Sequence, residues 1–192
     1  MRIILASASP RRRELMEMLG VRNLEICPAR GEEQPHPELS PAELVQALSL
    51  AKAREVAASA GAGTEDVVIG ADTVVALDGA VLGKPKDEAD AARMLRALSG
   101  RTHTVFTGVT VLRGGATLCR ADETRVRFRT LSDGEIARYI ATGEPMDKAG
   151  AYGAQGLASL FVEGLEGDFF NVMGLPLCML GQMLKEVGIE LI

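Results

Sequence analysis

The sequence predicts an α/β protein built on a mixed β-sheet, and three observations support this fold class. Helix-capping signals alternate along the chain with short apolar runs of strand character, as in proteins whose helices pack on a sheet. Hairpin turns interrupt the alternation, so a mixed sheet is favoured over a purely parallel one. With 192 residues, of which 47% are hydrophobic and 24% charged, the chain is long enough to bury a substantial core.

Five helices are predicted from residues that begin and end helices. Serine or aspartate provides an N-cap, proline fits the first helical position, and glutamate three residues after the cap completes a capping box. Glycine follows the last turn of several of these helices. The signals predict helices from Ser9 to Leu19, from Ser40 to about Ala60, from Asp87 to Ser99, from Ser132 to about Gly143 and from near Pro176 onward.

Strands are predicted where apolar and β-branched residues form short runs bounded by turn residues. Asp78-Gly79 predicts a tight hairpin, and Gly114-Gly115 predicts a second one. The predicted strands are Arg2 to Ala6, Val67 to Ala71, Thr73 to Leu77 with its hairpin partner at Val81, Thr104 to Leu112, Thr117 to Arg129, Leu160 to Glu163 and Phe169 to Val172. Because no repeat or linker interrupts this order, we expect a single domain over residues 1–192.

Composition and charge disfavour several classes of function. The net charge of −5 and the aromatic content of 4% argue against a nucleic-acid binder and favour a small anionic ligand held by local basic groups. No apolar run is long enough to span a bilayer and no signal peptide is recognisable, so we expect a soluble protein. The three cysteines are far apart and form no CxxC pattern, which indicates a reducing compartment, the cytoplasm.

The first candidate site is the segment from Ile3 to Arg13. A predicted strand leads here through Ser7 and Ser9 into a helix whose first turn carries three arginines. Unpaired N–H groups at a helix start, serine hydroxyls and guanidinium groups all favour an anion, which predicts a phosphate-binding loop. The residues alone leave a second interpretation equally open, in which the serines only cap the helix and the arginines are solvated.

Asp72 is the second candidate, because it stands between two apolar runs of strand character. A carboxylate that is buried alone is strongly destabilising, so we expect a cation, a metal ion or a hydrogen-bond network beside it. The alternative interpretation is a purely structural salt bridge or a turn at the end of a strand.

Further candidates gain meaning in combination. Glu33 lies in a proline-rich loop, and with Asp72 it offers the carboxylates that a magnesium-type ion bridging phosphates requires. Lys52 lies at the edge of a helix's apolar face, where a lysine that extends its ammonium group to solvent is the ordinary interpretation. Lys84 follows a predicted hairpin, and Gln155 follows a glycine-rich run whose backbone can approach a ligand.

Eight motifs in order resemble those of the Maf family and extend over nearly the whole chain. They are Ser7-Ala8-Ser9-Pro10-Arg11-Arg12, Glu33, Ala51-Lys52-Ala53, Gly70-Ala71-Asp72-Thr73, Gly83-Lys84-Pro85, Ser99-Gly100 to His103, Asp147-Lys148-Ala149-Gly150-Ala151-Tyr152 and Gly174-Leu175-Pro176. The resemblance implies a Maf/ITPase-like α/β fold with an elongated mixed sheet, flanking helices and two lobes around a deep cleft. It also implies a homodimer that uses Mg²⁺ or Mn²⁺ to hydrolyse a nucleoside triphosphate between its α- and β-phosphates.

The resemblance implies a role for each candidate residue. Asp72 would be the proton acceptor, and Glu33 with Asp72 would hold the metal ion. Arg11, Thr73 and Gln155 would select the substrate. The phosphates and the leaving pyrophosphate would be bound by Ser7, Ser9, Arg12, Lys52 and Lys84.

Gln155 decides which substrate we expect. The dTTP/UTP branch of the family carries glutamine in Gly153-Ala154-Gln155-Gly156, whereas the 7-methyl-GTP branch carries glutamate. A glutamine amide both accepts and donates, which matches the O4 and N3–H edge of a pyrimidine. We therefore expect dTTP and UTP as substrates. Whether modified pyrimidine triphosphates are substrates too is not decided by this residue.

Three alternatives remain at this point. One is a pyrophosphatase of the 7-methyl-GTP type. Another is a regulator without catalytic activity, because the family is also associated with inhibition of septum formation. The third is a phosphatase that releases orthophosphate.

Overall fold

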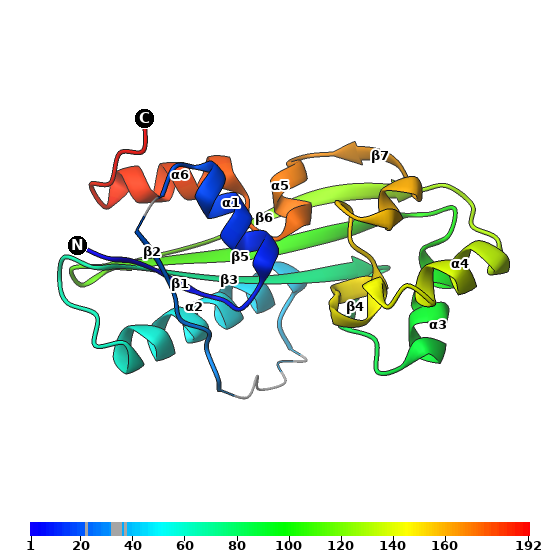
Figure 1. Ribbon diagram of the computed structural model, residues 1–192, viewed down its shortest axis with the longest axis horizontal. Coiled ribbons are helices and arrows are strands. Elements are labelled where there is room, and N and C mark those ends of the chain that lie inside the picture. The colour runs from blue at the N-terminus through cyan, green and yellow to red at the C-terminus, as the bar shows by residue number, and fades with distance from the viewer. Residues whose placement is uncertain (22, 32–35, 37) are drawn as a thin grey trace. The chain divides into compact units, whose positions relative to one another are not determined.

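The computed structural model describes residues 1–21, 23–31, 36 and 38–192 (Figure 1). Its strands are β1 (Ile3–Ala6), β2 (Leu24–Ile26), β3 (Val67–Leu77), β4 (Ala80–Leu82), β5 (Thr102–Arg113), β6 (Ala116–Phe128) and β7 (Val162–Glu166). Its α-helices are α1 (Pro10–Met18), α2 (Pro41–Ser59), α3 (Glu88–Leu98), α4 (Asp133–Ile140), α5 (Phe169–Met173) and α6 (Leu177–Glu186). Short 3₁₀ helices cover Glu144–Asp147, Ala149–Ala151 and Leu157–Leu160.

The strands within these described ranges form one seven-stranded sheet in the order β2-β1-β3-β5-β6-β7, with β4 paired to β3. The β1 strand is parallel to β2 and β3, whereas β4 and β7 are antiparallel to their partners. The predicted mixed sheet with flanking helices is thus confirmed.

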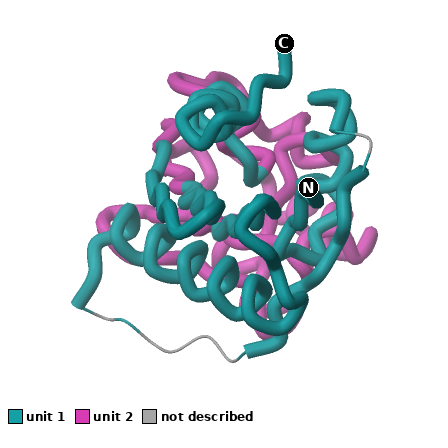
Figure 2. The backbone as a smooth tube through the Cα atoms, turned by 90° about the vertical axis from the view of Figure 1, so that its left-hand side faces the viewer, with its two compact units in different colours: residues 1–72, 107–122, 174–192 teal, residues 73–106, 123–173 magenta. Residues whose placement is uncertain are grey.

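The chain divides into two compact units (Figure 2). Unit 1 comprises residues 1–72, 107–122 and 174–192, and unit 2 comprises residues 73–106 and 123–173. Strands β3, β5 and β6 each contribute residues to both units. The single domain over residues 1–192 and the deep cleft stay predictions.

Helix α2 packs against β1 and β3 in unit 1. Buried side chains of the two strands, Ile4 and Val68 among them, contact Ala53 and Val56 of the helix. In Figure 1, α2 lies on one side of these strands, and α1 and α6 lie on the other. One face of the helix is therefore fixed on the part of the sheet that carries the candidate site.

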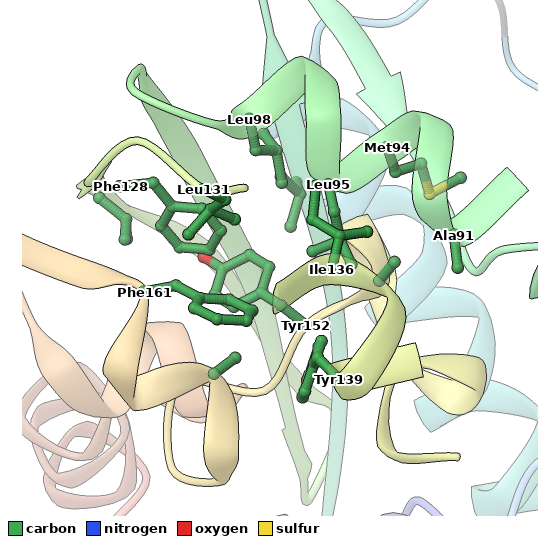
Figure 3. Close-up of a cluster of buried hydrophobic side chains, with 14 of the residues drawn as sticks. Ala91, Met94, Leu95, Leu98, Phe128, Leu131, Ile136, Tyr139, Tyr152 and Phe161 are labelled. Atoms are coloured by element: carbon green, nitrogen blue, oxygen red, sulfur yellow. The ribbon is translucent and has the colours of Figure 1, made fainter. Parts of the chain in front are cut away.

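The core of unit 2 forms between α3, α4 and the sheet (Figure 3). Phe128 of β6 is 1% exposed and contacts Tyr152 and Phe161 edge to face, with ring centroids 4.8 and 6.0 Å apart. Leu95 and Ile136 cover this aromatic group from the two helices. Such edge-to-face arrangements add to the burial that stabilises the core.

The predicted side-chain caps are confirmed at three helix starts, but not at Ser9. Ser40 and Ser132 each form the full capping box with the glutamate three residues later, and Asp87 accepts from the backbone of Asp90 at the start of α3. The α1 helix begins at Pro10 after Ser9, whose side chain makes no capping bond. The Asp78-Gly79 hairpin is confirmed too, since both residues have the positive φ that a tight β-hairpin requires.

Two strand predictions were wrong. The runs on either side of Asp72 belong to a single strand, β3, because the residue continues the pleat instead of ending it. Residues Phe169–Val172 form helix α5 and not a strand. Asp168 explains the difference, because its carboxylate accepts from the backbone N–H of Phe170 at 2.8 Å and so stabilises a helix start.

In the described part of the chain, no helix is both long and apolar enough to cross a membrane.

Candidate active site

The turn between β1 and α1 presents a serine beside the start of a helix. Parallel pairing sets Ala6 opposite Gly70 of β3, so Ser7 emerges next to the segment that carries Asp72. Ser7 is 8% exposed, and its hydroxyl accepts from the backbone N–H of Ser9 at 3.2 Å. The first turn of α1 follows directly, and its N–H groups favour an anion.

Arg12 connects three segments of unit 1. One terminal nitrogen donates to Ser7 Oγ at 3.1 Å and to the carbonyl of Ala71 at 2.9 Å. The Nε atom donates to the carbonyl of Gly174 at 2.7 Å. The guanidinium group is therefore bound by the protein. The alternative interpretation, in which the arginines of this segment are only solvated, is wrong for Arg12.

The two neighbouring arginines differ from Arg12. Arg13 is exposed and pairs with Glu17 one turn later at 2.8 Å, as expected for a surface residue of a helix. Arg11 is half-buried in the first turn of α1. Of the three arginines, Arg12 joins the turn to β3, through its bonds to Ser7 and to the carbonyl of Ala71.

Lys52 of α2 forms an ion pair with Asp72 of β3. Lys52 is not an ordinary solvent-directed lysine, because its side chain is 22% exposed and that of Asp72 is 12% exposed. The prediction that Asp72 requires a cation or another polar partner is confirmed. Because both side chains are largely buried, losing one of them leaves the other charge without a partner and destabilises the folded protein.

Gly70 explains why the two elements come so close. Residues two apart on a strand face the same side, so Gly70 and Asp72 both face α2. A Cβ atom on Gly70 would lie 2.3 Å from the carbonyl oxygen of Ser49 and 2.9 Å from Cβ of Ala53. The missing side chain lets the helix backbone approach the strand, and this approach brings Lys52 within reach of Asp72.

The site of unit 1 thus combines a buried carboxylate with a turn whose groups are suited to an anion. Ser7, Arg12, Lys52 and Asp72 are connected through direct contacts or through the neighbouring backbone of Ala71. Positive groups and helix N–H groups suit phosphate oxygens, and the carboxylate is suited to accept a proton or hold a cation. This arrangement can bind a phosphorylated ligand and act on water beside it.

Three further candidates belong to unit 2. Thr73 follows Asp72 in β3 and is half-buried. Lys84 is exposed, and the carbonyl of the preceding Gly83 accepts from the backbone N–H of Gly150 at 3.0 Å. Gln155 is exposed in a tight turn. The bond between Gly83 and Gly150 brings the Lys84 segment beside the glycine-rich run that leads to Gln155.

Lys148, in this glycine-rich run, is bound by neighbouring residues of the chain. Its ammonium group donates to the carbonyl of Glu144 and to the carboxylate of Asp147, both at 2.6 Å. Three residues later, Ala151 has a φ of 60°, which is uncommon for a residue with a side chain. Strained backbone of this kind clusters at functional sites.

The donor set for a metal ion is incomplete in the described residues. Glu33, the predicted second ligand, lies outside them, and the described residues contain no group of three or more His, Cys, Asp or Glu side chains suited to a metal ion. Asp72 is nevertheless of the right chemistry, because Mg²⁺ is commonly held by one or two carboxylates together with the substrate's phosphates.

Comparisons with known proteins agree with this description. The family model described as Maf-like protein matches residues 2–187. A Moorella thermoacetica protein named dTTP/UTP pyrophosphatase is 52% identical, with 98% of this chain and 96% of that protein covered. A Pelotomaculum thermopropionicum protein of the same name is 51% identical, with 97% and 96% covered.

A solved structure supports the fold. The Staphylococcus aureus Ham1 protein is 14% identical and superposes with a TM-score of 0.50, covering 97% of this chain and 100% of that one.

Proposed function

Since this chain belongs to the Maf family, we propose that it is a dTTP/UTP pyrophosphatase. It would hydrolyse the bond between the α- and β-phosphates and release the nucleoside monophosphate and pyrophosphate. The name of the relatives that are 51–52% identical over nearly their whole length supports this activity. The observation that carries the proposal is the buried carboxylate of Asp72, which pairs with Lys52 and follows Ala71, whose carbonyl accepts from Arg12.

Asp72 is proposed as the proton acceptor. Its carboxylate would orient and deprotonate a water molecule for attack on the α-phosphorus. Lys52 pairs with this carboxylate, and its ammonium group is compact enough to serve a phosphate oxygen as well.

Positioned positive charge would supply the rest of the catalysis. Phosphoryl transfer depends mainly on orientation and on neutralising charge that develops on the phosphate oxygens. The proposed phosphate ligands are the start of α1 with Ser7 and Ser9, the guanidinium group of Arg12, Lys52 and Lys84.

A divalent cation, Mg²⁺ or Mn²⁺, is proposed as the cofactor, with Asp72 and Glu33 as its protein ligands. When bound, such an ion would neutralise phosphate charge and orient the substrate.

Gln155 is proposed to read the base, with Arg11 and Thr73 as further specificity residues. The exposed amide can accept from N3–H and donate to O4 of a pyrimidine. A glutamate at this position would accept only, which suits a base that presents two donors. The glutamine therefore favours dTTP and UTP over 7-methyl-GTP.

We further propose that the enzyme is cytoplasmic and forms a homodimer. Each chain would be a single domain over residues 1–192. The wide spacing of the three cysteines supports the compartment, and three strands shared by both units support the single domain. Light scattering of the purified protein would test the dimer directly.

Product analysis tests the activity. The purified protein is incubated with dTTP, UTP or 7-methyl-GTP and one metal ion at a time, and pyrophosphate and orthophosphate are measured separately. We expect pyrophosphate with dTTP and UTP, and a lower preference for UTP in Gln155→Glu than in the matched surface control Gln182→Glu. Release of orthophosphate, or no turnover with any of these nucleotides, would contradict the proposal.

A further inference from the structure

Gln155 occupies the third position of a four-residue turn, Gly153–Gly156. The turn is closed by the backbone N–H of Gly156, which donates to the carbonyl of Gly153 at 3.0 Å. The residues on either side of Gln155 are bound to the rest of unit 2. The N–H of Gly153 donates to the hydroxyl of Tyr139 at 3.2 Å, and the N–H of Leu157 donates to Oε2 of Glu144 at 3.1 Å.

One carboxylate holds both ends of this turn. Glu144 Oε1 accepts from the Tyr139 hydroxyl at 2.9 Å, while Glu144 Oε2 accepts from Leu157. A chain of hydrogen bonds thus runs from Gly153 through Tyr139 to Glu144 and back to Leu157. The turn that carries Gln155 is enclosed by this chain of bonds.

The network requires a carboxylate at position 144. Both oxygens accept, one from a hydroxyl and one from a backbone N–H. A glutamine would replace one acceptor by an NH₂ group and leave at least one donor without an acceptor, which is unfavourable in a partly buried site.

The Tyr139 hydroxyl keeps its proton at the pH values at which the enzyme would work. Burial raises the pKa of Tyr139 above its usual value, and the hydrogen bond to Glu144 raises it further. The Tyr139 side chain is 4% exposed and its ring contacts Phe161 edge to face, with centroids 5.1 Å apart (Figure 3). Tyr139 therefore ties the turn to the aromatic core of unit 2.

Gly156 makes room for the carboxylate. A Cβ atom at this position would lie 2.3 Å from Oε1 and 2.6 Å from Cδ of Glu144. The φ of Gly156 is −94°, outside the left-handed region, and the carboxylate of Glu144 occupies the space that a side chain would need. A larger residue at position 156 would displace Glu144.

The backbone of Glu144 is fixed independently of the turn. Its N–H donates to Thr142 Oγ1 at 3.1 Å, and its carbonyl accepts from Lys148 Nζ at 2.6 Å. The carboxylate of Glu144 therefore extends from a backbone that is itself fixed by hydrogen bonds. Its own hydrogen bonds then fix the position of the turn.

We infer that Glu144, acting through Tyr139 and the flanking backbone, is a positioning residue that sets base selection by holding the Gln155 turn. This inference rests on the proposed function, in which Gln155 reads the pyrimidine edge. Neither Glu144 nor Tyr139 is assigned a contact with the substrate. An amide that must present a donor and an acceptor to one base edge needs a backbone held to a fraction of an ångström.

The test compares Glu144→Gln and Tyr139→Phe with the matched control Glu163→Gln, an exposed glutamate of β7 that pairs with Arg127. We expect KM for UTP and dTTP to rise about tenfold in the two network variants, with kcat changed by less than about threefold. The preference for UTP over 7-methyl-GTP should fall by about the same factor. Glu163→Gln should match the wild type.

A second readout does not depend on activity. Hydrogen exchange at the amides of Gly153 and Leu157 should be about tenfold faster in Glu144→Gln than in Glu163→Gln, since one hydrogen bond to the carboxylate is lost. Tyr139→Phe removes a single oxygen atom and supplies the kinetic and exchange data if the glutamate variant does not fold.

Gln155→Ala separates this inference from the proposed function. If Gln155→Ala leaves the substrate preference unchanged, base reading by Gln155 is wrong, and with it the basis of the inference. If Gln155→Ala changes the preference while both network variants keep wild-type KM, preference and amide exchange, the positioning role alone is overturned. An equal loss of kcat on every substrate without a change in preference would also overturn it.

Discussion

The ammonium group of Lys52 in α2 pairs with the carboxylate of Asp72 in β3, although twenty positions separate them in the chain. Both side chains are largely buried, at 22% and 12% exposure. The charges therefore stabilise each other in surroundings where neither is well solvated alone. We expect this pair to stabilise the protein, and it lies at the centre of the chemistry proposed for unit 1.

Lys52→Met should destabilise the protein by about 2 kcal/mol, because it leaves the Asp72 carboxylate without its partner in a largely buried position. This is less than the cost of breaking a fully buried pair, because water still reaches part of both side chains. The free energy of unfolding from urea titrations measures the effect. The double variant Lys52→Met/Asp72→Asn should lose less than the sum of the two single variants. Lys185→Met, at an exposed position in α6, serves as the control and should stay close to wild type. Strict additivity of the two site variants would show that the pair contributes nothing.

Gly70→Ala should lower both stability and activity. The new Cβ atom would lie 2.3 Å from the carbonyl oxygen of Ser49, so α2 must move away from β3 and Lys52 moves with it. Overpacking of this kind is expected to reduce the free energy of unfolding by about 2 kcal/mol.

Gly181→Ala is the matched control for this substitution. A Cβ atom at Gly181 in α6 has no heavy atom within 4 Å, so alanine should stabilise the helix by up to about 1 kcal/mol. Chemical denaturation and dTTP turnover of both variants give the comparison. An unaffected Gly70→Ala enzyme would show that the close approach of the helix to the strand is not required.

His103 should make stability depend on pH. The residue is 2% exposed, its Nε2 lies 2.7 Å from the Tyr152 hydroxyl, and burial lowers its pKa from 6.5 to about 4. Between these values the unfolded chain binds a proton that the folded protein does not. The free energy of unfolding should thus be highest above about pH 6.5 and fall by roughly 3 kcal/mol as the pH is lowered to 4.

Urea titrations at a series of pH values measure this slope. His103→Gln should lose the slope between pH 6.5 and 4, whereas His36→Gln should keep it. A wild-type slope in His103→Gln would assign the pH dependence to other groups.

Local signals in the sequence predicted much of the fold, because a cap or a tight turn depends on residues that are close in the chain. Ser40 with Glu43 and Ser132 with Glu135 are examples. Phe169–Val172 shows the limit. Its aromatic and β-branched residues favour a strand, yet the cap from Asp168 makes it a helix.

The candidate site was only partly predictable. Burial of a carboxylate in an apolar run is visible in the sequence, so the need of Asp72 for a partner was predicted. The sequence did not predict that Lys52 is the partner of Asp72, because the register of α2 on β3 depends on close packing at Gly70. Glu144 offered no signal at all, since its function depends on Tyr139 and Leu157, which meet it only in the folded chain.

Pyrophosphate release by Asp72→Asn tests the central claim most directly. The amide keeps the shape of the side chain but cannot accept a proton as the carboxylate does. We expect dTTP turnover to fall by about 100-fold or more, whereas the exposed control Asp133→Asn should stay within about twofold of wild type. Near-normal turnover by a folded Asp72→Asn protein would contradict the assignment of Asp72 as the proton acceptor.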